Sequence, residues 1–159
     1  MNWKIYCVFT LLMTVLCPIL ANAKDKDNVA LSYDIQCAGN PQQGYYLVEV
    51  TAYVSKKSDI NMDMVRKCAV HGVVFSGFSG DQGCRAQKAM LNATQEQQHA
   101  DFFNAFFKND YLHFANAVDS SLSTVKVGKR YAVTATIQVA KDKLRETLEK
   151  AGVIRKLGF

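Results

Sequence analysis

The stretch KRYAVTATIQVAKDKLRETLEKAGVI, residues 129–154, decides the fold because its periodicity changes from that of a strand to that of a helix. Apolar residues alternate with small or polar ones over residues 131–139, which predicts a strand with one buried face. Leu144 and Leu148 then follow at a spacing of four residues, which places them on one face of a helix. We expect the rest of the chain to supply partners for this strand and helix.

Two earlier segments show the same alternation of apolar and polar residues. They are residues 29–37 and residues 46–54, and the intervening residues 38–44 contain Gly, Asn and Pro, which favour a turn. Short alternating runs joined by a turn are typical of a β-hairpin. We therefore predict an antiparallel pair before the first helix.

The first helix is expected to begin near Ser58, Asp59 or Asn61, because all three side chains cap helix N-termini well. It should end near Phe75, and Gly72 either weakens it or lets another part of the chain come close. Glycines then interrupt the pattern, so residues 76–92 are predicted to form a loop. A loop of this length suggests a working role or an unrecognised short element.

A second helix follows, in which Thr94 and Gln97 have the spacing of a capping box. Residues 111–118 are ambiguous and lean to strand, and residues 124–128 extend the hairpin that ends in the strand 131–139. The expected order is β-β-α-loop-α-β-β-α. This order predicts an α+β fold, with an antiparallel sheet of about four strands and helices packed on one face.

The first 23 residues have the layout of a secretory signal peptide. Lys4 precedes an apolar run over residues 5–20, and residues 21–23 form a small Ala-Asn-Ala cleavage site. We expect a mobile tail over residues 24–28 and a single domain over residues 29–159, with no membrane span after processing. Leucine precedes Cys17, whereas a lipid-attachment cysteine normally follows a small residue, so lipidation there is not expected.

Export implies an oxidising compartment, where two of the three remaining cysteines can pair. The sequence leaves all three pairings of Cys37, Cys68 and Cys84 open. Because Cys68 falls on the apolar face of the first predicted helix, we favour a buried thiol there and a disulfide between Cys37 and Cys84.

The titratable residues of the sequence do not form a recognised catalytic motif. Cys68 and His71 are spaced to share a helix face, but the chain shows no diagnostic set of metal ligands, and no metal or other cofactor is predicted. Cys84 follows a glycine-rich turn beside Arg85, where a positive charge would favour a thiolate. An enzyme or ligand-binding domain would require His71, Cys84 and Arg85 to converge under a lid formed by the loop. No P-loop and no G-x-S-x-G nucleophile motif is present.

Aromatic residues suggest that the protein could bind a partner through an exposed apolar surface. The second predicted helix carries Phe103 and Phe107 on a broad apolar face, which either packs in the core or leaves one ring exposed to a partner. Tyr45 and Tyr53 offer a similar interaction surface on the second predicted strand.

Several stretches resemble an uncharacterised family of small secreted or periplasmic proteins from Bacteroidota. These are AVHGVVF at residues 69–75, QKAM at 87–90, GKRY at 128–131, LRETLEKAGVI at 144–154 and the terminal Gly-Phe. The pattern of elements is also similar to small α+β modules of outer-membrane lipoproteins and flagellar accessory proteins. The resemblance implies a location in the cell envelope and a role that is not enzymatic, and it assigns no catalytic residue.

The net charge of +5 comes from Lys and Arg residues that are scattered along the chain, so no nucleic-acid footprint is visible. We therefore expect a periplasmic or secreted module, with a possible outer-membrane association, that binds an envelope protein. The alternative is a ligand-binding or hydrolytic domain that uses the glycine-rich loop 76–92 as its lid.

Overall fold

Strand β5 (Arg130–Val139) lies at the centre of an open antiparallel sheet. β2 (Tyr46–Val54) pairs with one edge of β5 over nine residue pairs, and β1 (Tyr33–Cys37) pairs with the other edge of β2. β3 (Ala115–Ala117) and β4 (Ser123–Val127) follow one another along the opposite edge of β5. The long alternating segment thus contacts three of the four other strands.

The computed structural model describes residues 31–80, 83–120 and 122–156. The expected signal peptide (1–23), the expected tail (24–28) and the first residues of the predicted strand 29–37 lie outside these ranges. Within them the predicted α+β fold is confirmed, and the first hairpin pairs in the antiparallel direction.

The sheet has five strands where about four were expected. The ambiguous segment 111–118 divides into a 3₁₀ helix, η3 (Asp110–Phe114), and the short strand β3. The side chains of Tyr111 and Phe114 are both buried, and their spacing of three residues suits a 3₁₀ turn. β4 forms its own hairpin with β5 through a turn at Gly128, whose φ of 61° suits a glycine at the first turn position.

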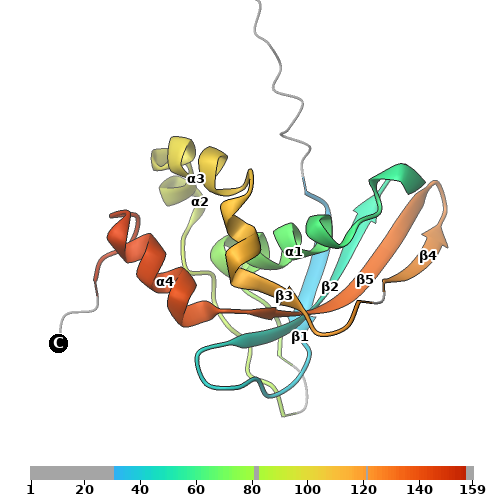
Figure 1. The fold of residues 1–159 in the computed structure, drawn as a ribbon, viewed down its shortest axis with the longest axis horizontal. Helices are drawn as coiled ribbons and strands as arrows, with labels where there is room; N and C mark the ends of the chain where they lie inside the picture. Colours follow the sequence, from blue (N-terminus) through green and yellow to red (C-terminus); the bar gives the residue numbers. More distant parts are fainter. Residues whose placement is uncertain (1–30, 81–82, 121, 157–159) are drawn as a thin grey trace, which may run out of the picture. The chain divides into compact units, whose positions relative to one another are not determined.

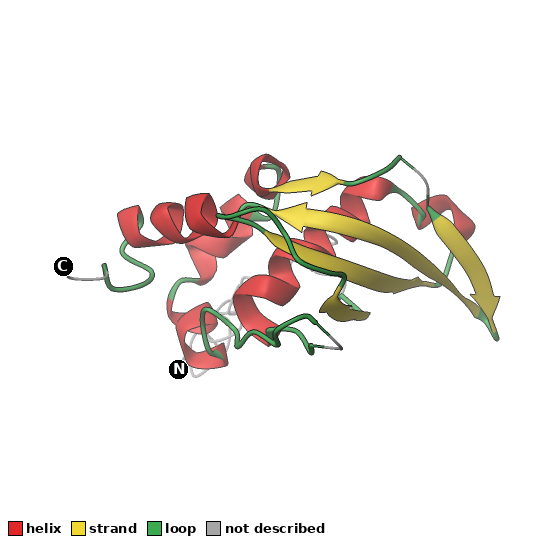
Figure 2. Ribbon diagram, turned by 90° about the horizontal axis from the view of Figure 1, so that it is seen from below, coloured by secondary structure: helices red, strands yellow, loops and turns green. Residues whose placement is uncertain are grey.

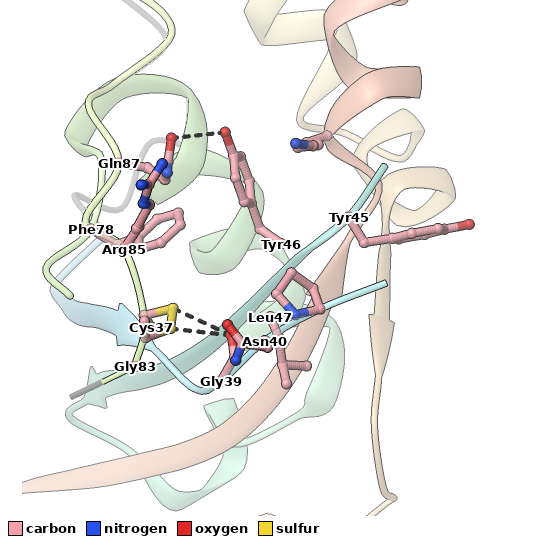
Figure 3. Close-up of a pocket in the computed structure, with 13 residues that line it drawn as sticks. Cys37, Gly39, Asn40, Tyr45, Tyr46, Leu47, Phe78, Gly83, Arg85 and Gln87 are labelled. Atoms are coloured by element: carbon pink, nitrogen blue, oxygen red, sulfur yellow. Dashed lines mark hydrogen bonds between the residues drawn. A yellow bond between two sulfur atoms is a disulfide. The ribbon is translucent and has the colours of Figure 1, made fainter. Parts of the chain in front are cut away.

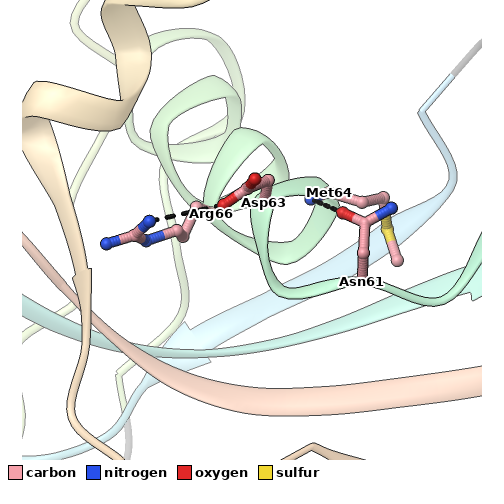
Figure 4. Close-up of polar contacts among 4 residues, drawn as sticks. All are labelled: Asn61, Asp63, Met64 and Arg66. Carbon is pink, nitrogen blue, oxygen red and sulfur yellow. Dashed lines mark hydrogen bonds and ion pairs between the residues drawn. The ribbon is translucent and has the colours of Figure 1, made fainter. Parts of the chain in front are cut away.

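Helix α1 (Met62–His71) packs across β2, β3 and β5 and covers the core face of the sheet. Of the three candidate caps, Asn61 is the one used: its Oδ1 accepts a hydrogen bond of 2.7 Å from the backbone N–H of Met64, while Asp63 pairs with Arg66 at 3.3 Å (Figure 4). A Cβ at Gly72 would lie 2.7 Å from Cδ1 of Ile35, so this glycine allows β1 to approach the helix end. A five-residue π-helical turn, Gly72–Ser76, continues α1.

The second predicted helix is broken into α2 (Ala93–Gln98) and α3 (Ala100–Phe106), because His99 leaves the helical conformation. The predicted Thr94–Gln97 capping box is wrong. Asn92 is the cap, and its reciprocal partner is Gln95, which has the same spacing two residues earlier. An asparagine cap satisfies the orphan amide of the third helical residue in the same way as a threonine.

The helices lie on one side of the sheet (Figure 1). β5 leads directly into α4 (Lys141–Lys150) at one end, whereas β4 lies at the other end, away from α4, in both views (Figures 1 and 2). The inward-facing residues of β2 and β5 join α1 and α4 in the core. They are Val48, Val50, Ala52, Val133, Ala135, Ile137, Val139, Val65, Cys68, Ala69, Val70, Leu144 and Leu148.

Gly77 provides a test of the packing between the π-helical turn and the loop. Its φ is 70°, and an added Cβ would collide with the carbonyl oxygen of Gln87 and lie 2.8 Å from the backbone nitrogen of Ala89. Gly152 has nearly the same φ, 71°, with no described heavy atom within 4 Å of the added Cβ.

We therefore expect Gly77→Ala to lower the free energy of unfolding more than Gly152→Ala. Both substitutions place a Cβ at a positive φ, and Gly77→Ala adds a backbone collision at a residue whose ψ of −172° lies in a region that is essentially restricted to glycine. Urea denaturation of the two variants measures the difference. Equal losses in the two proteins would show that the loop does not pack against Gly77 as described.

Candidate functional site

A hydrogen-bonded cluster joins β1 to the end of α1. The hydroxyl of Tyr33 lies 2.7 Å from Nδ1 of His71 and 3.0 Å from Oγ of Ser76. The rings of Phe75 and Phe107 contact the His71 imidazole, with centroids 4.9 and 5.6 Å away. Tyr33 thus bridges His71 and Ser76 in a half-buried aromatic setting.

Burial lowers the pKa of His71, and the positive charge of Lys67 lowers it further. Nε2 of His71 lies 4.0 Å from Oε1 of Glu96, so these groups form an ion pair only when the imidazole is protonated. Burial raises the pKa of Tyr33, and the hydrogen bond with Ser76 opposes this shift. The cluster is therefore neutral near pH 7 and serves as a polar link between β1, α1 and the π-helical turn.

Cys68 is the buried free thiol that its position on the apolar face of α1 predicts. Burial raises its pKa to about 12, which keeps the sulfur protonated and unreactive at neutral pH. In the described ranges, neither Cys68 nor His71 belongs to a group of three or more residues that could hold a metal ion.

Cys37 and Cys84 form a disulfide with a Cα–Cα distance of 6.0 Å. The bond attaches the loop segment around Cys84 to the end of β1, so Cys84 is not a thiol in this structure. The same loop is also held by its backbone. Phe78 and Gln87 exchange two hydrogen bonds of 2.9 and 3.0 Å, and the N–H of Cys37 donates to the carbonyl of Ser79 at 2.9 Å.

A pocket of about 320 Å³ opens beside the disulfide (Figure 3). Its walls come from the end of β1 and the turn after it, the start of β2, the loop segment 83–87 and the first residue of α4. The described lining residues are Cys37, Gly39, Asn40, Pro41, Tyr45, Tyr46, Leu47, Phe78, Gly83, Cys84, Arg85, Gln87 and Lys141.

The structure brings together two of the three residues of the predicted ligand loop. Cys84 and Arg85 line the pocket, whereas His71 is not among its lining residues and contacts Tyr33, Phe75 and Phe107 instead. Sequence reasoning missed Tyr46, Gln87 and Lys141, which come from three separate segments. Only Lys141, at the start of the last predicted helix, carried a signal, because a cation is unusual at a helix N-terminus.

The four aromatic residues predicted to form an interaction surface lie in different parts of the structure. Phe103 is 5% exposed and packs in the core, so it is not available as an interaction residue. Phe107 is half-buried against His71 and Tyr111. Tyr45 precedes β2 and lines the pocket, while Tyr53 lies near the far end of β2, where its hydroxyl donates to Asp34 at 2.7 Å. The two tyrosines therefore do not form one surface.

The most exposed large apolar side chains of the described ranges are three valines beside β5: Val118 (59%), Val125 (58%) and Val127 (55%). Val125 and Val127 pair with Ala132 and Arg130, and the N–H of Val118 donates to Thr136 at 3.0 Å. Ala132 and Arg130 are alternate residues of β5, so Val125 and Val127 lie on the sheet face opposite α1, and Val118 follows β3 along the same edge of β5. We call this set, Val118, Val125 and Val127, the valine column.

No family model matches the chain, and no curated protein or solved structure matches it either. Among the helices that the structure describes, none is long and apolar enough to cross a membrane.

The His71 cluster predicts a pH-dependent stability. The pKa of His71 is below its ordinary value of 6.5 in the folded state, so the unfolded chain takes up the proton first. Stability is therefore complete above about pH 6.5 and falls as the pH drops through the folded pKa. We expect His71→Gln to lower the free energy of unfolding by about 1 kcal/mol at pH 7.5, because the hydrogen bond with Tyr33 is lost. Between pH 7.5 and pH 5.5 the variant should then lose less stability than wild type.

Urea midpoints at the two pH values measure this difference. His113→Gln is the matched control, because it removes an exposed histidine from η3 and should leave the wild-type pH dependence in place. If His71→Gln and wild type lose the same stability between pH 7.5 and 5.5, His71 does not titrate as a buried base.

Proposed function

We propose that this protein is a non-enzymatic interaction module of the cell envelope, which binds a partner protein by accepting an extended segment of it along the free edge of β4. The observation that carries this proposal is the exposure of β4: all five of its residues are exposed, and two of them, Val125 and Val127, belong to the valine column. Exposed strand edges pair readily with another chain, so native proteins usually protect them.

The backbone of β4 has hydrogen-bonding groups to offer. Val127 and Arg130 flank the two-residue turn, and in such a hairpin the flanking pair exchanges both backbone hydrogen bonds. The pattern alternates along the ladder, so Val125 and Val127 direct their N–H and C=O groups to β5. Thr124 and Lys126 direct theirs to the open edge.

The side chains around β4 indicate the chemistry of the partner. The valine column offers apolar contacts, and the exposed cations Lys126, Lys129 and Arg130 border it. An extended segment that alternates apolar and acidic residues would complement both features. Lysine is also a common protective residue on edge strands. The charge of Lys126 would therefore disfavour pairing with uncharged strands and favour pairing with acidic ones.

Two further observations support the location. The signal-peptide pattern of residues 1–23 favours export, and the Cys37–Cys84 disulfide suits an oxidising compartment. The resemblance to small secreted or periplasmic proteins of Bacteroidota and to outer-membrane modules agrees with the envelope as the site of action.

The edge-strand proposal predicts that Thr124→Pro abolishes partner binding while the domain stays folded. Proline removes the backbone N–H that Thr124 presents at the open edge, and it does not remove a hydrogen bond to β5. The matched control is Thr124→Val, which changes the side chain and keeps the N–H. Tagged variants are crosslinked in intact cells and purified, and the bound proteins are identified by mass spectrometry.

We expect wild type and Thr124→Val to recover the same envelope protein in stoichiometric amount, and Thr124→Pro to lose it. Circular dichroism and urea denaturation of Thr124→Pro show whether the fold is intact. Recovery of the partner by a folded Thr124→Pro protein contradicts edge pairing, and a wild-type protein that purifies alone contradicts the interaction module itself.

A further inference from the structure

We propose that the pocket beside the disulfide binds a small organic anion, in which a carboxylate or phosphate group is attached to an aromatic ring or a comparable apolar body. This site lies at the end of the sheet where Tyr46 pairs with Val139, whereas β4 pairs with the opposite half of β5, from Arg130 to Thr134, so the proposal is independent of the interaction at β4.

The charge of the described lining favours an anion. Arg85 and Lys141 both line the pocket, and none of the 13 described lining residues is acidic. Among the described residues neither cation has a carboxylate within ion-pair distance, since the ion pairs there involve Arg66, His71, Arg145 and Lys150. Two cations that have no anionic partner among the described residues and share one concave surface are a suitable receptor for carboxylate or phosphate, which the arginine fork contacts through two N–H groups.

The position of Lys141 strengthens this argument. It is the first residue of α4, where the positive end of the helix dipole disfavours a cation, and the cap residue Ala140 offers no side-chain hydrogen bond. Asp142 in the first turn offsets part of this charge, but it lies beside Gly44 and is not among the lining residues. A bound anion would reduce the remaining unfavourable charge at the helix start.

The apolar walls set the kind of anion. Tyr46 stands at the centre of the lining, and its ring contacts Phe78 edge-on with centroids 5.2 Å apart (Figure 3). Nζ of Lys141 lies 5.2 Å from the centroid of the same ring. The volume of about 320 Å³ is at the lower limit of ordinary ligand pockets, so the body of the ligand is about the size of a single substituted ring.

The walls are also held in place before a ligand arrives. The hydroxyl of Tyr46 donates to Oε1 of Gln87 at 3.2 Å, which links β2 to the loop. The disulfide attaches Cys84 to β1, and the backbone N–H of Asp142 donates to the carbonyl of Gly44 at 3.3 Å. Because a covalent bond and hydrogen bonds already hold these walls in position, the protein loses little conformational entropy when a ligand binds.

The test uses benzoate, phenyl phosphate, neutral benzamide and inorganic phosphate as probes of ¹⁵N-labelled protein. We expect benzoate or phenyl phosphate to shift the amide resonances of Gly39, Asn40 and Gln87 in a saturable manner, and the two anions distinguish a carboxylate site from a phosphate site. Benzamide and inorganic phosphate should each bind at least tenfold more weakly. Absence of shifts with both aromatic anions overturns the proposal, as does equal binding of benzamide or of inorganic phosphate.

Two charge variants identify the contacts. Arg85→Gln and Lys141→Gln should each weaken binding of the preferred anion at least tenfold. Lys126→Gln, which removes the same charge from β4, should leave it unchanged. Unshifted resonances outside the pocket show that each variant is folded. Wild-type affinity in both pocket variants would overturn the assignment.

Reduction of the disulfide tests the contribution of the rigid loop. We expect a reductant to weaken anion binding at least tenfold, because the segment around Cys84 is then held to β1 only by hydrogen bonds. The double variant Cys37→Ser, Cys84→Ser should behave in the same way without reductant. Unchanged affinity in both experiments would overturn the part assigned to the disulfide.

Discussion

The structure depends on the pairing of β5 with neighbours on both of its edges. Nine residue pairs join it to β2, and β3 and β4 divide the other edge between them. Because side chains alternate along a strand, this pairing directs Val133, Ala135, Ile137 and Val139 towards the helices and leaves the intervening residues on the opposite face. A shift of one residue would expose the core side of the whole strand, so the register of β5 decides the register of the sheet.

The periodicity of the sequence predicted the parts of the fold in which side-chain burial follows backbone geometry. β5, the β1–β2 hairpin, α1 and α4 all have regular apolar faces, and each was expected close to its observed position. The errors occur where short-range geometry decides. Asn92–Gln95 and Thr94–Gln97 have the same capping spacing, so the spacing does not distinguish them, and in the structure the helix is capped at Asn92 and broken at His99. The segment 111–118 mixes a 3₁₀ turn with a strand, and no single period describes it.

The candidate sites were harder to predict because their residues come from separate segments. The pocket combines Tyr46, Arg85 and Lys141, which only the folded sheet and the disulfide bring together. The alternative of a ligand-binding or hydrolytic domain required His71 to converge with Cys84 and Arg85. The π-helical turn instead directs it to Tyr33 and the aromatic rings. For Phe103 the sequence left core packing and a partner contact open, and the structure buries the ring in the core, which is the more common place for an aromatic residue on a broad helix face.

The two ends of β5 have different surroundings. At the Val139 end, the turn after β1, the start of β2, the loop segment 83–87 and the first residue of α4 build the concave surface of the pocket. At the Arg130 end, all five residues of β4 are exposed, although the β5 residue Val133 with which Thr124 pairs is buried. Substitutions there remove little buried area, so their effect on stability is small and their effect on binding can be measured separately. The proposed ligand pocket and the proposed partner edge therefore lie at opposite ends of one sheet, so a substitution at either can be tested without disturbing the other.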